Sequence, residues 1–250
     1  MNRIAMITGA TSGIGAATAN LLAKNQFDLI LCGRRADRLL KIQAELSALT
    51  RVFTLSFDVR DLTAVNNAIK SLPANWQNID VLINNAGNAH GLDPIQTGST
   101  EDWDAMMDIN VKGVLYVSRE IMPRMIARQR GHIINIGSIA GKEVYPNGNV
   151  YCASKHAVEA ITNGMRLDLN PHGIKVTGIH PGMVETEFSL VRFKGDGNRA
   201  KNVYQGLTPL SANDIADLIL FALTRPPHVV LADVVVLPIA QASATVAKRT

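Results

Sequence analysis

A tyrosine and a lysine stand four positions apart in the segment NVYCASKHAVEA, which spans residues 149–160. In a helix, this spacing places Tyr151 and Lys155 on one face, a single turn apart. A phenol has an ordinary pKa near 10 and is a poor base, but a nearby cation favours the phenolate. Lowering that pKa by ~3 units requires ~4 kcal/mol of differential stabilisation, which close cations can supply in a low dielectric. The pair is therefore either an acid/base site for a substrate hydroxyl or an ordinary solvated helix face.

A glycine-rich segment, TGATSGIG, directly follows the first apolar run of the chain. Its glycines are spaced G-x-x-x-G-x-G, and glycine allows a tight turn and a close approach of backbone N–H groups to a phosphate. The helix that begins here would present its positive N-terminal end to a pyrophosphate. The spacing differs from the common G-x-G-x-x-G fingerprint, and glycines after a strand often form only a turn. The position after a first strand favours a dinucleotide-binding loop of Gly9, Thr11, Ser12, Gly13, Ile14 and Gly15.

The end of the second apolar run distinguishes between the two nicotinamide dinucleotides. In NAD-binding doubly wound folds, an acidic residue near this point bonds the ribose 2′-hydroxyl, but Gly33 takes that place here. Arg34 and Arg35 follow at once, and guanidinium groups bind phosphate through charge-assisted, bidentate hydrogen bonds. The alternative is a solvated helix entry, since arginine is mostly a surface residue. The missing acid and the two adjacent arginines together favour NADP, through its 2′-phosphate.

Further polar residues follow the next three apolar runs. Asp58, in FDVRD, could cap the helix that begins near Asp61 or bond an adenine amine. Asn84 and Asn85, in INNAG, stand at the end of a central strand, where open α/β sheets bind ligands. Ser138, in INIGSIAG, could cap a turn or hold a substrate oxygen.

Asn110 lies in MDINVKG, inside an otherwise strong helical pattern. Asparagine is a poor residue for a helix interior because its side chain competes with the backbone for hydrogen bonds. This position therefore predicts a kink or an internal hydrogen-bonding role.

Short apolar runs alternate with longer helical patterns. This order would place the polar residues described above at the carboxyl edge of a parallel sheet. The predicted strands are RIAMIT, DLILC, VFTLSF, VLIN, HIINI, KVTGIH and VVVL, and the predicted helices span 14–24, 37–49, 61–71, 103–127, 150–169 and 212–223. The strands are apolar throughout, as strands covered on both faces must be. The pattern predicts a single doubly wound, Rossmann-type α/β domain over residues 1–250, with a seven-stranded parallel sheet and helices on both faces.

The composition excludes several classes of protein. The chain has 250 residues, 47% hydrophobic and 18% charged, and no apolar stretch approaches the ~20 residues of a membrane span. Two cysteines, Cys32 and Cys152, predict free thiols in a reducing cytoplasm. The net charge of +4 is scattered and aromatics make up only 5%, so we expect no nucleic-acid partner. The six histidines show no ligand spacing, so we expect no metal site.

Two regions stand outside the regular alternation. Residues 181–210 are long for a loop, which predicts a functional lid with a short helix of its own. Residues 238–250 show no clear periodicity, so this tail is either disordered or packed on a neighbouring subunit.

The ordered set TGATSGIG, NNAG, Asn110, Ser138, YCASK and HPG resembles the short-chain dehydrogenase/reductase family over nearly the whole chain. The resemblance implies that Tyr151 is the acid/base, and that Lys155 binds the nicotinamide ribose and lowers the pKa of the tyrosine. It implies that Ser138 orients the substrate oxygen and that Asn110 holds a water in a proton relay. It also implies contacts with the adenosine and ribose from Asp58, Val59, Asn85, Ala86 and Gly87, and with the nicotinamide side from Pro181, Gly182, Val184 and Thr186.

Longer segments are similar to a narrower group, the NADP-dependent 3-hydroxy acid dehydrogenases. These segments are SLPANWQNIDVLINNAG, EDWDAMMDIN, GHIINIGS, GNVYCASK and PGMVETEFSLVRFKGD, and the last covers much of the lid. The similarity implies oxidation of the 3-hydroxyl of small acids such as serine, L-allo-threonine and 3-hydroxypropionate, and a homotetrameric assembly.

A small hydroxy acid has a carboxylate that needs a cationic partner. The lid segment SLVRFKGD offers Arg192 and Lys194, and Arg192 is favoured because its guanidinium binds carboxylates through two parallel hydrogen bonds. The rival interpretation pairs both cations with the cofactor pyrophosphate or with solvent.

Two other functions remain open at this point. One is a 3-oxoacyl-carrier-protein reductase or general carbonyl reductase of the same family. The other is a non-catalytic NADP-binding scaffold, although such proteins usually lack the tyrosine or the lysine that this chain keeps.

Overall fold

Seven strands form one parallel sheet in the computed structural model, which describes residues 2–250. The strand order is β3-β2-β1-β4-β5-β6-β7, so the chain builds outward from β1 in one direction and then from β4 in the other. The predicted seven-stranded, doubly wound sheet is confirmed. The strands are β1 (Ile4–Thr8), β2 (Asp28–Gly33), β3 (Val52–Ser56), β4 (Ile79–Asn84), β5 (His132–Ile136), β6 (Lys175–Pro181) and β7 (Asp233–Val236).

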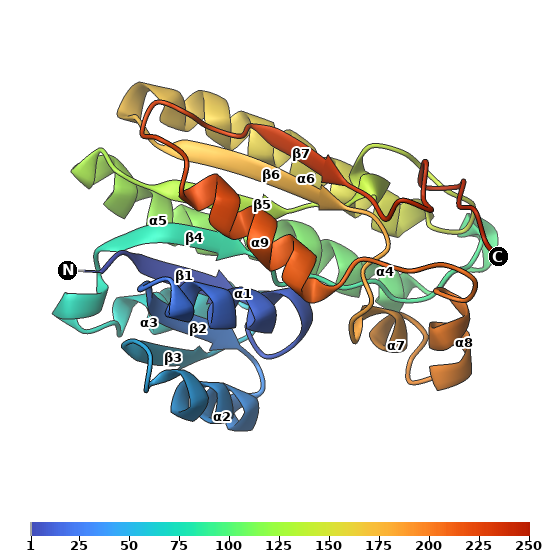
Figure 1. The fold of residues 1–250 in the computed structure, drawn as a ribbon, viewed down its shortest axis with the longest axis horizontal. Helices are drawn as coiled ribbons and strands as arrows, with labels where there is room; N and C mark the ends of the chain where they lie inside the picture. Colours follow the sequence, from blue (N-terminus) through green and yellow to red (C-terminus); the bar gives the residue numbers. More distant parts are fainter. Residues whose placement is uncertain (1) are drawn as a thin grey trace.

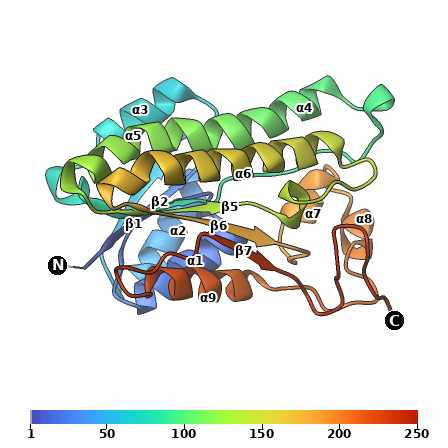
Figure 2. The ribbon, with the colours of Figure 1, turned by 90° about the horizontal axis from the view of Figure 1, so that it is seen from above.

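Helices cover both faces of the sheet, as Figures 1 and 2 show. One face carries α3 (Leu62–Lys70), α4 (Thr100–Met107), α5 (Gly113–Arg128) and α6 (Asn149–Leu169). The other carries α1 (Gly13–Lys24), α2 (Ala36–Leu46) and α9 (Ala212–Leu223). Short helical turns are η1 (Ala74–Trp76), η2 (Ile95–Thr97), η4 (Ile139–Gly141) and η5 (Asn170–His172).

The long helix predicted over residues 103–127 is present with an interruption. Five residues, η3 (Asp108–Lys112), adopt a π-helical turn between α4 and α5, and Asn110 lies at its centre. This agrees with the expectation that the asparagine would disturb the helix. The predicted helix at 37–49 ends earlier, at Leu46.

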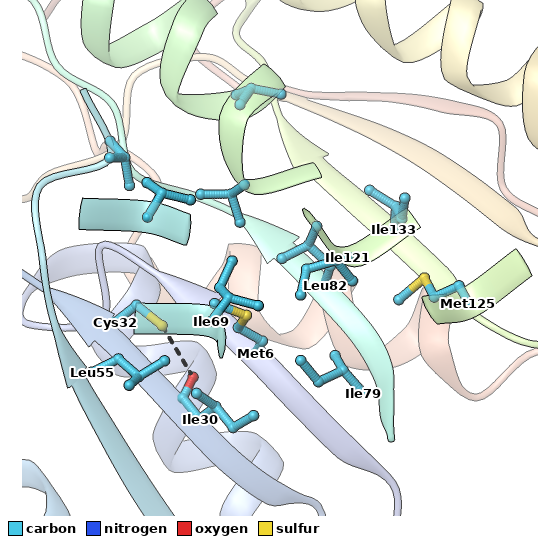
Figure 3. Close-up of a cluster of buried hydrophobic side chains, with 14 of the residues drawn as sticks. Met6, Ile30, Cys32, Leu55, Ile69, Ile79, Leu82, Ile121, Met125 and Ile133 are labelled. Carbon is cyan, nitrogen blue, oxygen red and sulfur yellow. Dashed lines mark hydrogen bonds between the residues drawn. The ribbon is translucent and has the colours of Figure 1, made fainter. Parts of the chain in front are cut away.

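The central strands are buried because apolar layers pack on both of their faces. Met6, Leu82 and Ile133 point to the layer under α3, α5 and α6 (Figure 3). Ile7 and Ile83, the next residues along β1 and β4, point to the opposite layer under α1, α2 and α9. Alternate residues therefore feed opposite layers, which explains why these strands are apolar at every position.

The lid and the tail lie beyond the carboxyl ends of the strands (Figure 1). The lid contains two short helices, α7 (Phe188–Arg192) and α8 (Gly197–Asn202), where one was expected. The tail is ordered against the lid of its own chain: Arg249 donates to the carbonyl of Val203 at 3.1 Å, and the Thr250 N–H donates to Gly206 at 2.9 Å. Over residues 2–250, no helix is long and apolar enough to cross a membrane.

Candidate active site

The glycine loop between β1 and α1 requires glycine at each of its three motif positions. Gly9 and Gly13 have φ of +66° and +52°, values that side chains rarely adopt. A Cβ on Gly15 would lie 2.3 Å from the Gly9 carbonyl oxygen. This close approach lets α1 begin directly behind the loop, so its N-terminus faces the carboxyl edge of the sheet.

A cavity of about 540 Å³ runs along this edge between the glycine loop and the lid. Its size and position are those of ligand sites in open α/β sheets. Of the residues predicted to form the site, it is lined by Gly9, Thr11, Ser12, Gly13, Ile14, Arg34, Arg35, Asp58, Val59, Asn85, Ala86, Gly87, Ser138, Tyr151, Lys155, Pro181, Gly182, Val184, Thr186 and Arg192. Gly15 and Asn110 lie behind its wall.

The two arginines after β2 face the cavity in different ways. Arg34 lies 3.7 Å from the carboxylate of Asp58. Arg35 donates from Nη2 to the Thr11 and Ser12 hydroxyls at 2.9 Å each, which ties it to the glycine loop. The arrangement concentrates guanidinium groups where the turn after β2 meets the loop, and it fits a phosphate ester there.

Asp58 does not cap the helix that follows it. Asp61 does so, by accepting a hydrogen bond from the Ala64 N–H at 3.0 Å. Asp58 instead accepts from the Arg60 guanidinium at 2.7 Å. Its pKa is lowered, because the bonds from Arg60 outweigh the effect of burial.

Asn84 and Asn85 both act within the protein. Asn84 is buried and donates to Ser118 at 2.9 Å and Asn135 at 2.8 Å. Asn85 donates to the Thr8 carbonyl at 2.9 Å, so its side chain braces the turn after β1. The cavity wall beyond this brace is formed by the chain from Asn85 to Gly87.

Tyr151 and Lys155 are both buried and line the cavity beside α6 and the end of β5, which is its inner end. Burial raises the pKa of Tyr151 above its ordinary value, nearby Tyr145 adds to this effect, and the Ser138 hydroxyl opposes it. Burial lowers the pKa of Lys155 from 10.5 to about 8, and its Nζ donates to the Ile136 carbonyl at 3.0 Å. Within the protein itself, desolvation thus works against the phenolate that the sequence spacing predicted.

Asn110 connects α4–α5 to the loop after β4. Its Nδ2 donates to the Asn88 carbonyl at 2.9 Å and to Ser154 at 3.0 Å, and its Oδ1 accepts from the Asn88 N–H at 2.9 Å. The π-helical turn is thereby joined to α6, the helix that carries Tyr151, through Ser154. Of the two alternatives predicted for this residue, the internal hydrogen-bonding role is observed, and it accompanies a π-helical turn.

The two lid cations have separate surroundings. Arg192 donates from Nη1 to the Tyr145 hydroxyl at 2.9 Å and from Nε to the Gly91 carbonyl at 3.0 Å. Its guanidinium carbon lies 5.6 Å from the centre of the Tyr151 ring. Lys194 is exposed and pairs with Asp102 at 3.0 Å, and it does not line the cavity. Only Arg192 of this pair is therefore placed at the inner end.

Several residues that line the cavity were not predicted. They include Asn88, Tyr145, Glu187, Phe188 and, from the tail, Gln241 and Ala244. Phe188 packs on the Tyr151 ring with centroids 5.6 Å apart. None of these positions carries a spacing signal, because each lies in the lid, in the tail or in a loop and its place depends on contacts with distant segments.

A tyrosine–lysine pair and a glycine loop that share one cavity of a doubly wound sheet define a dinucleotide-dependent oxidoreductase. The family model described as short chain dehydrogenase matches residues 3–195, and the chain belongs to this family.

Relatives of this chain are similar along its whole length. An NADP-dependent 3-hydroxy acid dehydrogenase of Salmonella typhi is 44% identical, over 96% of this chain and 97% of the relative. The sulfoacetaldehyde reductase 2 of Chromohalobacter salexigens is 43% identical, over 97% and 96%. The solved closed form of a serine dehydrogenase complexed with NADP+ has a TM-score of 0.93 and 40% identity, and 99% of each chain is covered.

Proposed function

We propose that this protein is an NADP-dependent oxidoreductase that moves a hydride between NADP and the 3-hydroxyl or 3-keto group of small 3-hydroxy acids. The observation that carries this proposal is the guanidinium of Arg192, 5.6 Å from the Tyr151 ring at the inner end of the cavity. A cation so close to the acid/base suits a substrate whose carboxylate lies a few bonds from the reacting hydroxyl. The relatives named as 3-hydroxy acid and serine dehydrogenases support the same substrate class.

Tyr151, Lys155, Ser138 and Asn110 are proposed to carry the acid/base chemistry. During oxidation, Tyr151 takes the hydroxyl proton as the C–H hydride leaves, and during reduction it returns that proton. Ser138, which lines the cavity together with Tyr151, orients the substrate oxygen. Lys155 holds the nicotinamide ribose, and Asn110 holds the end of a proton relay. NADP, when bound, supplies the hydride acceptor and a positive charge that favours the phenolate.

The remaining predicted residues are proposed to hold NADP. The loop from Gly9 to Gly15 receives the pyrophosphate, and Arg34 and Arg35 receive the 2′-phosphate. The chain at 58–59 and 85–87 lines the adenosine and ribose, and the chain at 181–186 lines the nicotinamide. The fit rests on the glycine loop, which side chains would block, and on the arginines gathered beside it.

Arg192 is proposed to bind the substrate anion. Nε and Nη1 hold the side chain against Gly91 and Tyr145, while a guanidinium group has five N–H donors in all, so donors remain for a carboxylate. Arg192→Ala should raise the KM for hydroxy acids by ~10-fold or more, given ~1.5–3 kcal/mol for a hydrogen bond to a charged group. The KM for an uncharged alcohol should change far less, and an equal change in both would contradict the assignment.

A sulfonate is a second candidate for the anion. The relative named as a sulfoacetaldehyde reductase is as similar to this chain as the hydroxy acid dehydrogenases are, and a guanidinium binds either oxyanion. A 3-oxoacyl-carrier-protein reductase, a general carbonyl reductase and a non-catalytic scaffold are further alternatives, and each makes a different prediction in the assay below.

The test follows reduced nicotinamide by absorbance with serine, L-allo-threonine, 3-hydroxypropionate, sulfoacetaldehyde, an uncharged ketone and a 3-oxoacyl carrier protein, each with NADP(H) and with NAD(H). Turnover of the hydroxy acids with NADP, abolished in Tyr151→Phe, is the expected result. Preference for sulfoacetaldehyde would identify the substrate anion as a sulfonate. Preference for the carrier-protein substrate or for the uncharged ketone would identify the corresponding reductase and contradict the hydroxy acid assignment. NADPH binding without turnover of any carbonyl would favour the scaffold.

We also propose a cytoplasmic homotetramer. Both cysteines, Cys32 and Cys152, are buried free thiols, which fits a reducing compartment. Leu115 of α5 and Leu167 of α6 are 42% and 77% exposed, so these two helices offer apolar surface to further copies of the chain. Light scattering after size-exclusion chromatography should give four times the 27.0 kDa chain mass.

A further inference from the structure

Glu187 joins the lid to the arginines at the opposite end of the cavity. The residue directly precedes α7, and its two carboxylate oxygens are shared between two cations. One oxygen accepts from Arg35 Nη1 at 3.1 Å, and the other accepts from Arg38 Nη1 at 2.8 Å. The partners lie about 150 positions earlier in the chain, so the contact crosses the cavity from the lid to the entry of α2.

The hydrogen bonds of Arg35 make this contact relevant to dinucleotide binding. Its Nε and Nη2 donate to the Thr11 hydroxyl, Nη2 also donates to Ser12, and Nη1 donates to Glu187. Within residues 2–250, Glu187 is the one carboxylate paired with Arg35, since Asp58 pairs with Arg34 and Arg60. The bond from Arg38, and then those from Arg35, lower the pKa of Glu187, so it is ionised at neutral pH.

We propose that Glu187 limits how strongly NADP is preferred over NAD, by competing with the 2′-phosphate of NADP for Arg35. This inference rests on the proposed function, in which the arginines after β2 receive that phosphate. Two anions cannot share the same donors without repulsion, and the phosphate carries the larger charge. Binding of NADP therefore displaces the carboxylate, whereas NAD, which lacks the phosphate, leaves it in place.

The displacement has a consequence for the lid. Phe188, the next residue, packs on the Tyr151 ring with centroids 5.6 Å apart. A phosphate bound at the adenosine end thus acts on a segment that touches the acid/base at the other end. The opposite arrangement is a clamp, in which Glu187 keeps its arginines over the bound cofactor and strengthens the binding of both dinucleotides.

The affinities of Glu187→Gln separate these two arrangements. Dissociation constants for NADPH and NADH are measured by the fluorescence of the reduced nicotinamide, for wild type and for the variant. Competition predicts that NADPH binds ~5-fold more tightly to Glu187→Gln, about 1 kcal/mol, as expected when exposed ion pairs no longer compete. The NADH constant should stay the same. Weaker binding of both dinucleotides, or an unchanged NADPH constant, overturns the inference.

Glu185→Gln is the matched control, because it removes the same charge two residues earlier from an exposed side chain with no ion pair in residues 2–250. If Glu185→Gln bound NADPH more tightly by the same factor, the effect would come from net charge alone, and the inference would be overturned. If wild type fails to prefer NADPH over NADH, the cofactor assignment fails and the inference fails with it. If wild type prefers NADPH and Glu187→Gln behaves like wild type, only the inference fails.

Limited trypsin digestion without dinucleotide gives a readout that is independent of affinity. If Glu187 holds the entry of the lid, Glu187→Gln should be cleaved several-fold faster at Lys194, Arg199 and Lys201 than wild type or Glu185→Gln. Equal cleavage rates in all three proteins would contradict a role for Glu187 in holding the lid.

Discussion

Replacing the buried lysine of the site by methionine should make the protein more stable while abolishing turnover. Burial lowers the pKa of Lys155 from 10.5 to about 8, and at pH 7 the ammonium is charged in both the folded and the unfolded protein. The difference corresponds to about 3 kcal/mol, on the order of magnitude that a shift of this size carries. The folded protein bears that cost to keep the charge in the cavity.

The net gain in Lys155→Met is smaller than this cost. The bond from Nζ to the Ile136 carbonyl, 3.0 Å long, is lost, and an unpaired buried carbonyl costs about 1 kcal/mol. Methionine has a similar length, so little cavity forms. We expect the free energy of unfolding at pH 7 to rise by about 2 kcal/mol, measured by urea denaturation at one fixed protein concentration. Lys70→Met, which removes an exposed lysine at the end of α3, should change it little.

The pH dependence checks that the lysine charge is the cause. Because the pKa is lower in the folded state, the unfolded state binds more protons between pH 8 and 10.5, and wild type gains stability as pH rises through that window. Lys155→Met lacks this gain, so its advantage should shrink toward pH 10.5. A less stable Lys155→Met at pH 7, or an advantage that stays constant with pH, would refute the reasoning.

Three further predictions concern single positions. Burial, and then Lys175, lowers the pKa of His132 to about 3, so wild type should lose about 1.4 kcal/mol per pH unit below pH 6.5 relative to His132→Gln, measured by urea denaturation at pH 7 and 5. Gly15→Ala should abolish NADPH binding in a fluorescence titration and lower Tm, because its Cβ would overlap the Gly9 carbonyl. Asn110→Ala should lower the free energy of unfolding by at least about 2 kcal/mol and reduce kcat, because it leaves the N–H and C=O of Asn88 without partners.

Periodicity identified the scaffold because the physics of a parallel sheet is local. Each strand is buried on both faces and each crossover helix on one, so the apolar pattern of β4 or α9 is visible within a few residues. The helix ends were less accurate, and α2 ends at Leu46 because the chain must turn back to meet β3. The lid and tail carry no such pattern: their order comes from contacts such as Arg249 to Val203, between segments far apart in the chain.

The residues of the site likewise fall into those that local sequence patterns predict and those that they do not. The glycine loop, the arginines and the tyrosine–lysine pair were predictable because each depends on spacing within one turn or one helix. Glu187 was not predictable, although it pairs with one of the arginines proposed to bind the 2′-phosphate. The sequence has Gly33 in place of an acidic residue at the end of β2, yet the lid brings a carboxylate to Arg35 from about 150 residues away. A charge that a distant segment brings to the site cannot be predicted from the residues next to the site in the sequence.

The pKa shifts of Tyr151 and Lys155 indicate why the site holds a buried lysine although its burial destabilises the fold. Burial moves the pKa of Tyr151 up and that of Lys155 down, so desolvation favours the neutral form of both groups. The phenolate therefore depends on cations, and the ammonium of Lys155 can supply one only while it keeps its proton. A pKa of about 8 leaves the lysine charged at neutral pH but close to losing that charge. Oxidation should weaken above this pH for lack of the lysine charge, even though rising pH alone favours removal of the substrate proton. A rate for alcohol oxidation that kept rising from pH 8 to pH 10 would show that Lys155 is not the cation that supports the phenolate.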